Sequence, residues 1–328
     1  MFGDRADEAL RAARDEGLSK DELRDRFDCV VGVRDASFEV YEGEIFCIMG
    51  LSGSGKSTLV RHINRLIDPT AGEIHVAGDR VDTMDETALN TLRAEKIGMV
   101  FQHMALWPHR TLVETVGFGL EVRGVPKAER RERALAALTD MELVDWADQY
   151  PNELSGGMQQ RVGLARALAA DPDILLMDEP FSALDPLIRR QLQNQFLDLS
   201  RKLGKTTIFI THDLDEAIRM GDRIAIMKDG EIVQTGTAED IVTAPANDYV
   251  ADFVENVPKG GFITARQIMD THGADTAGRS IAPDTPLNEV LAKFAEDQTP
   301  IAVTEGGATL GCVTVGAALS ALAGKDET

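Results

Sequence analysis

Residues 50–58, "GLSGSGKST", decide the fold of this chain. Four of them satisfy the pattern G-x-x-x-x-G-K-[ST]: Gly50, Gly55, Lys56 and Ser57. An apolar run, "EIFCIM" (44–49), predicts a strand that leads into the loop, and residues 58–67 have the pattern of a helix that leads out of it. This order of strand, loop and helix is typical of a phosphate-binding loop. The stretch therefore predicts a site for a nucleoside triphosphate.

The residue types of the loop indicate what each would do. Glycines let backbone amides approach phosphate oxygens closely, the Lys56 ammonium reaches the β- and γ-phosphates, and the Ser57 hydroxyl suits Mg²⁺. We expect the whole loop to bind the nucleotide: Gly50, Leu51, Ser52, Gly53, Ser54, Gly55, Lys56, Ser57 and Thr58.

Two carboxylates, Asp178 and Glu179, follow the apolar strand pattern "ILLM". A carboxylate at the end of a strand beside a phosphate loop is placed to hold Mg²⁺, which is the role expected for Asp178. Glu179 would point differently, which suits it to polarise an attacking water as a general base. The alternative is that both are solvated acids at the start of a turn at Pro180.

His212 and Gln102 each end a predicted strand, "TTIFIT" and "IGMVF" respectively. His212 would lie at the same sheet edge as Asp178, where it could contact the γ-phosphate and act in catalysis. A histidine at a strand end also occurs as a purely structural residue, and glutamines end strands routinely. Gln102 is therefore the weaker candidate when taken alone.

A second stretch, "LSGGMQQR" (154–161), also resembles an anion site, because a hydroxyl and two glycines precede a predicted helix over 158–169. The chain would then have two phosphate cradles. Nothing in its local pattern explains why it needs both.

Composition limits the class of protein. The chain has 328 residues, 43% of them apolar, and a formal net charge of −21, which argues against nonspecific binding to nucleic acid or to an anionic membrane. Three scattered cysteines predict neither a zinc site nor a disulfide framework. The polar N-terminus and the lack of a long apolar run predict a protein that stays in the cytosol.

The pattern along the chain predicts three parts. Residues 1–28 form an N-terminal helical extension, and residues 29–257 alternate strands and helices as in an α/β domain, with a helical subdomain at about 103–170. A linker around "ENVPKGG" leads to a small α+β module over 258–328.

Taken together, these motifs resemble those of the ATP-binding cassette family, the ATPase subunits of ABC transporters. The motifs of that family are matched in order, as follows: the Walker A loop (50–58), the Q-loop glutamine Gln102, the signature "LSGGMQQR" (154–161), the Walker B run "ILLMDE" (174–179), the D-loop "SALD" (182–185) and the switch histidine His212. The resemblance implies a P-loop NTPase fold, ATP and Mg²⁺ as cofactors, and ATP hydrolysis.

The resemblance also implies a homodimer whose two copies pair head to tail. Three signature residues would then face the γ-phosphate held by the other copy: Ser155, Gly156 and Gly157. Gln102 would contact Mg²⁺ and the attacking water, and Asp185 would lie near the symmetry axis. Phe27 is at the family's position for the aromatic ring that stacks on adenine, although Phe38 and Tyr41 are nearby and Phe27 could instead close the N-terminal helix onto the sheet.

The sequence around the motifs, such as "DEPFSALDPLIRR" (178–190), resembles one branch of this family. That branch contains the ATPase subunits of importers for quaternary amines such as glycine betaine, proline betaine or choline. Its partners would be transmembrane permease subunits and a periplasmic or extracellular substrate-binding protein, with no nucleic acid, at the cytoplasmic face of the inner membrane. Alternatives are an importer for another small solute such as an amino acid, or a soluble ATPase acting on nucleic acid or the ribosome.

Two further features follow from the resemblance. The tail from Phe262 resembles a single CBS module; Ala317 stands where a nucleotide-binding module would have an aspartate, so dimerisation or packing is favoured over nucleotide sensing. Trp107, in "MALWPHRT" (104–111), would either meet the permease or anchor the helical subdomain.

Overall fold

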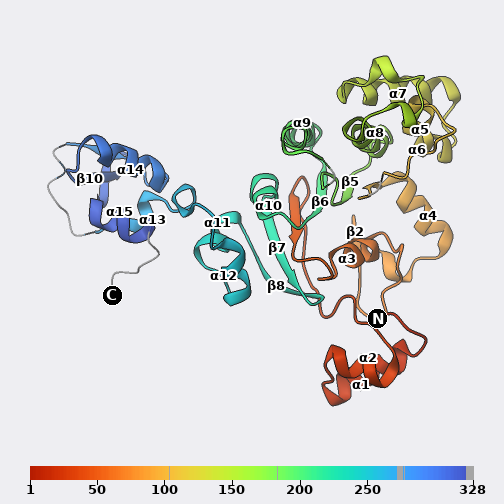
Figure 1. Ribbon diagram of the computed structural model, residues 1–328, viewed down its shortest axis with the longest axis horizontal. Coiled ribbons are helices and arrows are strands. Elements are labelled where there is room, and N and C mark those ends of the chain that lie inside the picture. The colour runs from red at the N-terminus through yellow and green to blue at the C-terminus, as the bar shows by residue number, and fades with distance from the viewer. Residues whose placement is uncertain (103, 183, 272–275, 277, 323–328) are drawn as a thin grey trace. The chain divides into compact units, whose positions relative to one another are not determined.

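The computed structural model describes residues 1–102, 104–182, 184–271, 276 and 278–322. Within that part of the chain there are two compact units, Met1–Thr235 and Gly236–Thr328 (Figure 1). The division lies earlier than the predicted boundary at 257/258, because the last strand of the main sheet ends at Gly236 and the helices after it pack with the C-terminal unit.

The first unit is built on a six-stranded sheet in the order β4-β5-β6-β1-β7-β8. The strands are β1 (Ile45–Met49), β4 (Ile97–Val100), β5 (Ile174–Asp178), β6 (Thr206–Thr211), β7 (Arg223–Lys228) and β8 (Glu231–Gly236). The pairs β4–β5, β5–β6, β6–β1 and β1–β7 are parallel. Parallel strands buried on both faces read as continuous apolar runs, which is why the sequence predicted β1, β4, β5 and β6.

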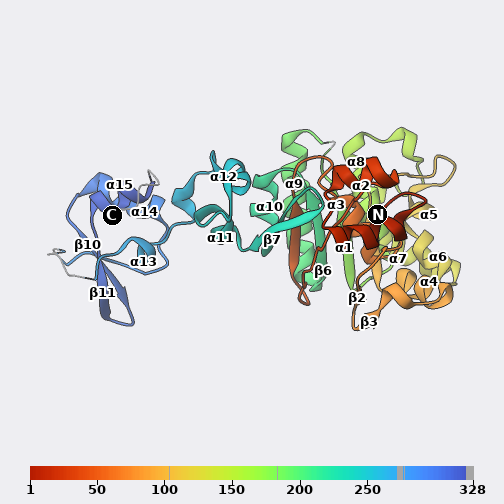
Figure 2. The ribbon, with the colours of Figure 1, turned by 90° about the horizontal axis from the view of Figure 1, so that it is seen from below.

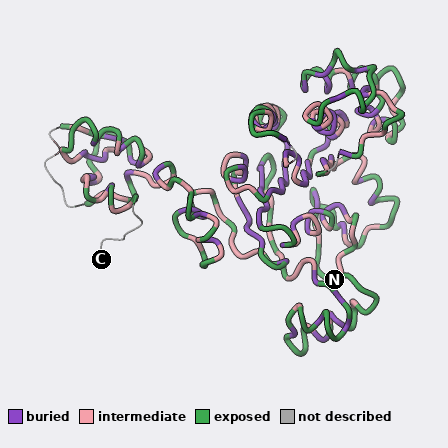
Figure 3. Tube along the Cα trace, viewed as in Figure 1, coloured by how far each residue is buried: buried purple, intermediate pink, exposed green. Residues whose placement is uncertain are grey.

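Helices cover both faces of this sheet, as Figure 2 also shows. On one face, α3 (Lys56–Ile63) packs over β5 and β6, and its Leu59 and Val60 meet Phe46 and Ile48 in the main core. On the other, α10 (Leu214–Met220) packs on β1, and the turn after it lies against Cys47. Buried backbone runs through the middle of the sheet (Figure 3). Alternate side chains of each strand thus serve opposite layers.

A helical subdomain lies between β4 and β5. Its helices are α5 (Leu112–Val116), α6 (Phe118–Val122), α7 (Lys127–Asp140) and α8 (Gly156–Ala169). Helix α8 also packs on β4, so the subdomain is attached to the edge of the sheet. The segment before it contains the short strands β2 (His75–Val76) and β3 (Asp79–Arg80) and helix α4 (Glu86–Glu95).

The N-terminal extension forms helices α1 (Ala6–Glu16) and α2 (Lys20–Phe27). Gly17 ends α1 in a left-handed conformation, and a capping box of Ser19 and Glu22 begins α2. The two helices enclose a small apolar cluster of their own, which includes Leu23 and Phe27.

The second unit has a three-stranded sheet in the order β11-β10-β9. Its elements are α11 (Ala238–Thr243), α12 (Asp248–Val254), α13 (Ala265–Ile268), β9 (Ser280–Ile281), α14 (Leu287–Glu296), β10 (Ile301–Glu305), β11 (Ala308–Val313) and α15 (Val315–Leu322). A turn at Gly306-Gly307 joins β10 to β11, which pair antiparallel. Leu287, Val290 and Phe294 of α14 pack with Ile301 and Val303 to form a core.

Candidate functional site

The loop 50–58 follows β1 and has a conformation that requires glycine. Gly50 and Gly55 have φ angles of 154° and 100°. A Cβ atom on Gly55 would lie 2.2 Å from the carbonyl oxygen of Gly32, and one on Gly50 would lie 2.2 Å from that of Met227. The tip of the loop, Leu51 to Gly53, is exposed. The backbone is therefore fixed at its base and open to a ligand at its tip.

Lys56 begins α3 and is buried inside the loop. Its Nζ donates hydrogen bonds to the carbonyl oxygens of Gly50 at 2.8 Å and Leu51 at 3.0 Å. Burial lowers the pKa of Lys56, and the nearby carboxylates of Glu179 and Asp178 partly oppose that effect. The Lys56 ammonium at the centre of the loop is thus bonded only to neutral carbonyl oxygens. An anionic phosphate oxygen would form a stronger hydrogen bond with it than these carbonyls do.

Ser57 and Asp178 are two of the three residues that the sequence predicted as ligands of Mg²⁺, and they lie in contact, whereas the third, Gln102, bonds to Glu179. The Ser57 hydroxyl donates to Oδ1 of Asp178 at 2.8 Å, and Arg61 Nη2 lies 3.5 Å from Oδ2. Asp178 is 2% exposed. Such hard oxygen ligands suit Mg²⁺, which commonly binds one or two carboxylates together with phosphate oxygens. In the described residues no group of three or more His, Cys, Asp or Glu side chains could hold a metal by itself.

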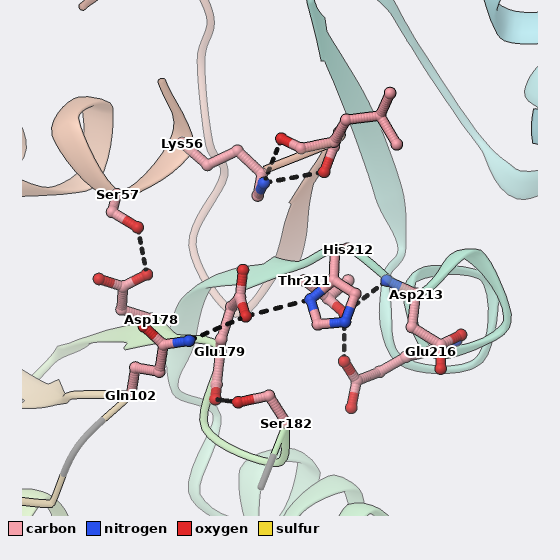
Figure 4. Close-up of polar contacts among 12 residues, drawn as sticks. Lys56, Ser57, Gln102, Asp178, Glu179, Ser182, Thr211, His212, Asp213 and Glu216 are labelled. Atoms are coloured by element: carbon pink, nitrogen blue, oxygen red, sulfur yellow. Dashed lines mark hydrogen bonds and ion pairs between the residues drawn. The ribbon is translucent and has the colours of Figure 1, made fainter. Parts of the chain in front are cut away.

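Glu179 is the point at which three loops meet (Figure 4). Its Oε2 accepts a hydrogen bond from Nε2 of Gln102 at 3.3 Å and lies 3.0 Å from Nδ1 of His212. The three residues follow the ends of β4, β5 and β6, and they meet because the carboxyl ends of parallel strands share one edge of the sheet. Glu179 has a positive φ of 47°, a conformation that is rare for glutamate and concentrated at functional sites.

The strand end behind His212 is held by a buried acid. Glu216 accepts hydrogen bonds from the hydroxyl of Thr211 and from Nε2 of Gln193, the latter at 2.7 Å. Burial raises the pKa of Glu216 and outweighs the hydrogen bonds from Thr211 and Gln193, which lower it. Sequence reasoning missed Glu216, because its contact with Thr211 depends on helix α10, which the sequence analysis did not predict.

Two of the signature residues lie exposed at the start of a helix. Ser155 begins α8 as its N-cap, and Ser155 and Gly156 are exposed. Asp185 is exposed and caps α9 (Pro186–Leu203) through the amide of Ile188 at 3.2 Å. Among the described residues, no hydrogen bond or ion pair joins 154–161 to the loop 50–58. The two cradles of the sequence are therefore separate structures.

The expectation that Phe27 stacks on adenine is not supported by its position. Phe27 is 9% exposed, and its ring lies beneath the guanidinium groups of Arg5 and Arg26 in the cluster of the N-terminal helices. Phe38 stacks on Phe46 in the core, and Tyr41 lies beside Arg223.

Phe2, which sequence reasoning missed, lies beside the loop instead. Its backbone pairs with Val30 through two hydrogen bonds of 2.8 Å. A Cβ atom placed on Gly32 would be 2.7 Å from the Phe2 ring and 3.2 Å from the methyl group of Thr58, so ring and methyl flank the same glycine. Phe2 is 41% exposed. No sequence signal marks it, because the position depends on pairing across 28 residues.

A hollow of about 740 Å³ lies between the sheet edge and the helical subdomain. Trp107 lines it, packs on Phe118 at 4.5 Å between ring centroids, and lies near Arg110 and Arg166. Trp107 is therefore an anchor of the subdomain and part of an open apolar surface at the same time.

The sequence is similar to those of known transport proteins. A family model described as "ABC transporter" matches residues 33–182. The glycine betaine transport ATP-binding protein of Bacillus subtilis (strain 168) is 56% identical over 82% of this chain and 64% of its own length. The glycine betaine/carnitine transport ATP-binding protein of Listeria monocytogenes is 43% identical over 99% of this chain and 96% of its own length.

One solved structure of a dimeric ATP-binding cassette, described as a post-hydrolysis state bound to ADP and Pi, is 39% identical. It matches with a TM-score of 0.59 over 63% of this chain and 90% of its own length. None of the helices in the described residues is both long enough and apolar enough to cross a membrane.

The raised pKa of Glu216 predicts a pH dependence of stability. Because the folded state favours the protonated acid, Glu216 destabilises the fold increasingly as pH rises from the ordinary range of a glutamic acid through its raised pKa. Glu216→Gln removes the charge and retains a polar group whose oxygen can accept from Gln193 and whose amide can donate to the hydroxyl of Thr211. We expect its free energy of unfolding, relative to the unmodified chain, to rise with pH over that interval and then level off.

Tryptophan fluorescence during urea unfolding at a series of pH values measures this difference. Both tryptophans, Trp107 and Trp146, lie in the same unit as Glu216, so the signal reports that unit. Glu132→Gln, which removes an exposed carboxylate, is the control. A difference that does not vary with pH would show that Glu216 does not titrate as the structure indicates.

Proposed function

The chain belongs to the ATP-binding proteins of the ABC transporter family, so it is an ATPase, and we propose that it drives an importer of small quaternary amines. Glycine betaine, proline betaine and choline are the proposed solutes. The observation that carries this proposal is the identity of 43–56% to transport proteins named for glycine betaine, in one case over nearly the full length of both chains. The solute itself would be bound by other subunits.

Hydrolysis follows from the geometry around Glu179. An attacking water gives its proton to the Glu179 carboxylate as its oxygen bonds to the γ-phosphorus, and the bond to the β-phosphate oxygen breaks. His212 and Gln102 hold that carboxylate in place, and Lys56 stabilises the phosphate oxygens. Ser57 and Asp178 would hold Mg²⁺, which neutralises the charge of the phosphates when bound.

A second copy of the chain would complete each site. The exposed N-terminus of α8 presents Ser155 and Gly156 with a positive helix end, and this suits a phosphate held by the Walker A loop of the other copy. The dimeric state named for the similar solved structure supports this arrangement. Asp185, exposed at the start of α9, would lie in the same interface.

The hollow beside Trp107 is the proposed contact with the permease. It is lined by apolar side chains and by cations, including Phe101, Arg93 and Arg166. An apolar segment of a membrane partner with acidic or carbonyl groups would fit that surface. The subunit would then work as a peripheral protein at the cytoplasmic face of the inner membrane, in a system with a substrate-binding protein.

Phe2 is the proposed stacking partner of adenine, in place of Phe27. Its half-exposed ring lies next to Thr58, the last residue of the Walker A loop, which is where a base attached to bound phosphates can reach it.

A packing or dimerisation role is proposed for the CBS-like module in the C-terminal unit. Thr314 caps α15 through the amide of Ala317 at 3.2 Å, and Ala317 has no carboxylate with which to bind a ribose.

Glu179→Gln tests the catalytic part of the proposal. We expect ATP binding to persist and hydrolysis to fall by about 10²–10⁴, because the general base is lost. The measurement uses the complex with permease and binding protein in vesicles, where hydrolysis by the unmodified complex should rise on addition of glycine betaine. Normal turnover in the variant would remove Glu179 from this role, and indifference to quaternary amines would contradict the proposed substrate class.

Ser155→Arg tests the composite site. The bulky cation blocks the signature of one copy from reaching the phosphates of the other, so we expect hydrolysis to be lost while the chain still binds ATP with nearly unchanged affinity. Titration with a fluorescent ATP analogue measures binding, and phosphate release measures hydrolysis. Loss of binding in the variant would mean that the signature belongs to the site of its own chain.

Phe2→Ala should weaken binding of ATP about tenfold, since stacking of one base on an aromatic ring is worth roughly 1–3 kcal/mol. Phe2→Trp should preserve affinity, and Phe27→Leu should leave it unchanged. Equilibrium binding is measured in the Glu179→Gln background to prevent turnover. If Phe27→Leu rather than Phe2→Ala weakened binding, the adenine contact would return to Phe27.

A further inference from the structure

Arg189 joins the D-loop to the segment that carries His212. It lies in the first turn of α9, directly after the D-loop residue Asp185. Its Nη2 donates to the carbonyl oxygen of Leu184 at 3.2 Å, and its Nη1 donates to Oδ2 of Asp213 at 3.3 Å. One guanidinium thus connects a loop beside β5 with a loop beside β6.

Asp213 also bonds to residues before and after His212 in the chain, so it fixes the backbone around that histidine. Its amide donates to the hydroxyl of Thr211 at 3.0 Å, and its second carboxylate oxygen accepts from the amide of Glu216 at 3.2 Å. His212 lies between these anchors, and its Nδ1 is 3.0 Å from Glu179. A displacement of Asp213 therefore displaces the histidine that positions the general base.

A second contact links α9 to α10 and differs from that of Arg189. Gln193 lies one turn after Arg189 on α9 and donates to Glu216 of α10 at 2.7 Å. That bond joins one helix to another and does not reach the D-loop. Of Arg189 and Gln193, only Arg189 connects the carbonyl oxygen of Leu184 in the D-loop to Asp213, the residue after His212.

We propose that Arg189 is a positioning residue that transmits the state of the D-loop to His212, so that closure of one copy on the other governs hydrolysis. The proposal rests on the head-to-tail dimer proposed above. A partner that presses on Asp185 and its neighbours would move Leu184, and the two charge-assisted bonds of Arg189 would carry that movement to Asp213. Hydrolysis at one site would then depend on ATP at the other.

The test measures the dependence of hydrolysis on ATP concentration in the full transporter complex. We expect Arg189→Gln to lower the Hill coefficient from about 2 to about 1 and kcat about tenfold, with ATP binding unchanged. Arg189→Lys, which keeps the charge and can reach one acceptor, should recover part of both. Arg201→Gln, at an exposed arginine of the same helix, is the matched control and should behave as the unmodified complex.

Asp213→Asn tests the other end of the connection without disturbing the fold. Asparagine caps a helix about as well as aspartate, so α10 is preserved while the ion pair is lost. We expect the same loss of cooperativity as in Arg189→Gln, and no further loss in the double variant. This result would follow only if both residues act through one contact, because a purely structural defect would lower thermal stability and leave the Hill coefficient unchanged.

Two outcomes would overturn the proposal, and they are distinguishable. If the unmodified complex hydrolyses ATP cooperatively and Arg189→Gln keeps both the Hill coefficient and kcat, the inference about Arg189 is wrong while the dimer stands. If the unmodified complex shows no cooperativity and Ser155→Arg remains active, the proposed dimer fails and the inference fails with it. Where Arg189→Gln does not fold, Asp213→Asn decides the question by the same criteria.

Discussion

Parallel pairing of β4, β5, β6 and β1 is the constraint on which the site depends. Four parallel strands end at one edge of the sheet, and a different functional group lies at the end of each. These groups are Gln102, the carboxylates of Asp178 and Glu179, His212 and the phosphate loop. Residues as far apart in sequence as Ser57 and Asp178 then meet at 2.8 Å. A slip of one residue in any of these pairs would turn the groups to opposite faces of the sheet.

Four of the residues predicted from sequence, Gln102, Asp178, Glu179 and His212, owe their position to this pairing, whereas the signature residues were predicted from the resemblance. Apolar strand patterns located the sheet, and a polar residue at the end of a strand needs no other information to be placed at the edge. Phe27 and Phe2 show where this reasoning stops, because their placement depends on how a terminal segment docks rather than on its local pattern. The unusual φ of Glu179 and the role of Arg189 were equally invisible, since both arise from contacts between loops.

The boundary of the C-terminal unit illustrates a related limit. Pro258 and the glycines after it mark a break in the local pattern, and turn residues are a sound signal of a loop. They do not say which side of the loop the preceding helices pack against. The tertiary contacts of α11 and α12 determine this, and they place both helices in the C-terminal unit. Domain limits depend on packing partners, so they are less readable than strands or loops.

The contacts of Glu179 would gain from the proposed second copy. Glu179 is held by two exposed side chains, Gln102 and His212, whose bonds of 3.3 Å and 3.0 Å compete with water. Hydrogen bonds of this kind gain strength when water is excluded and the local dielectric falls. A second copy that covers the site would supply both effects together with the helix dipole of α8. Closure and chemistry would then be one event, which is the property that an energy-coupling subunit needs.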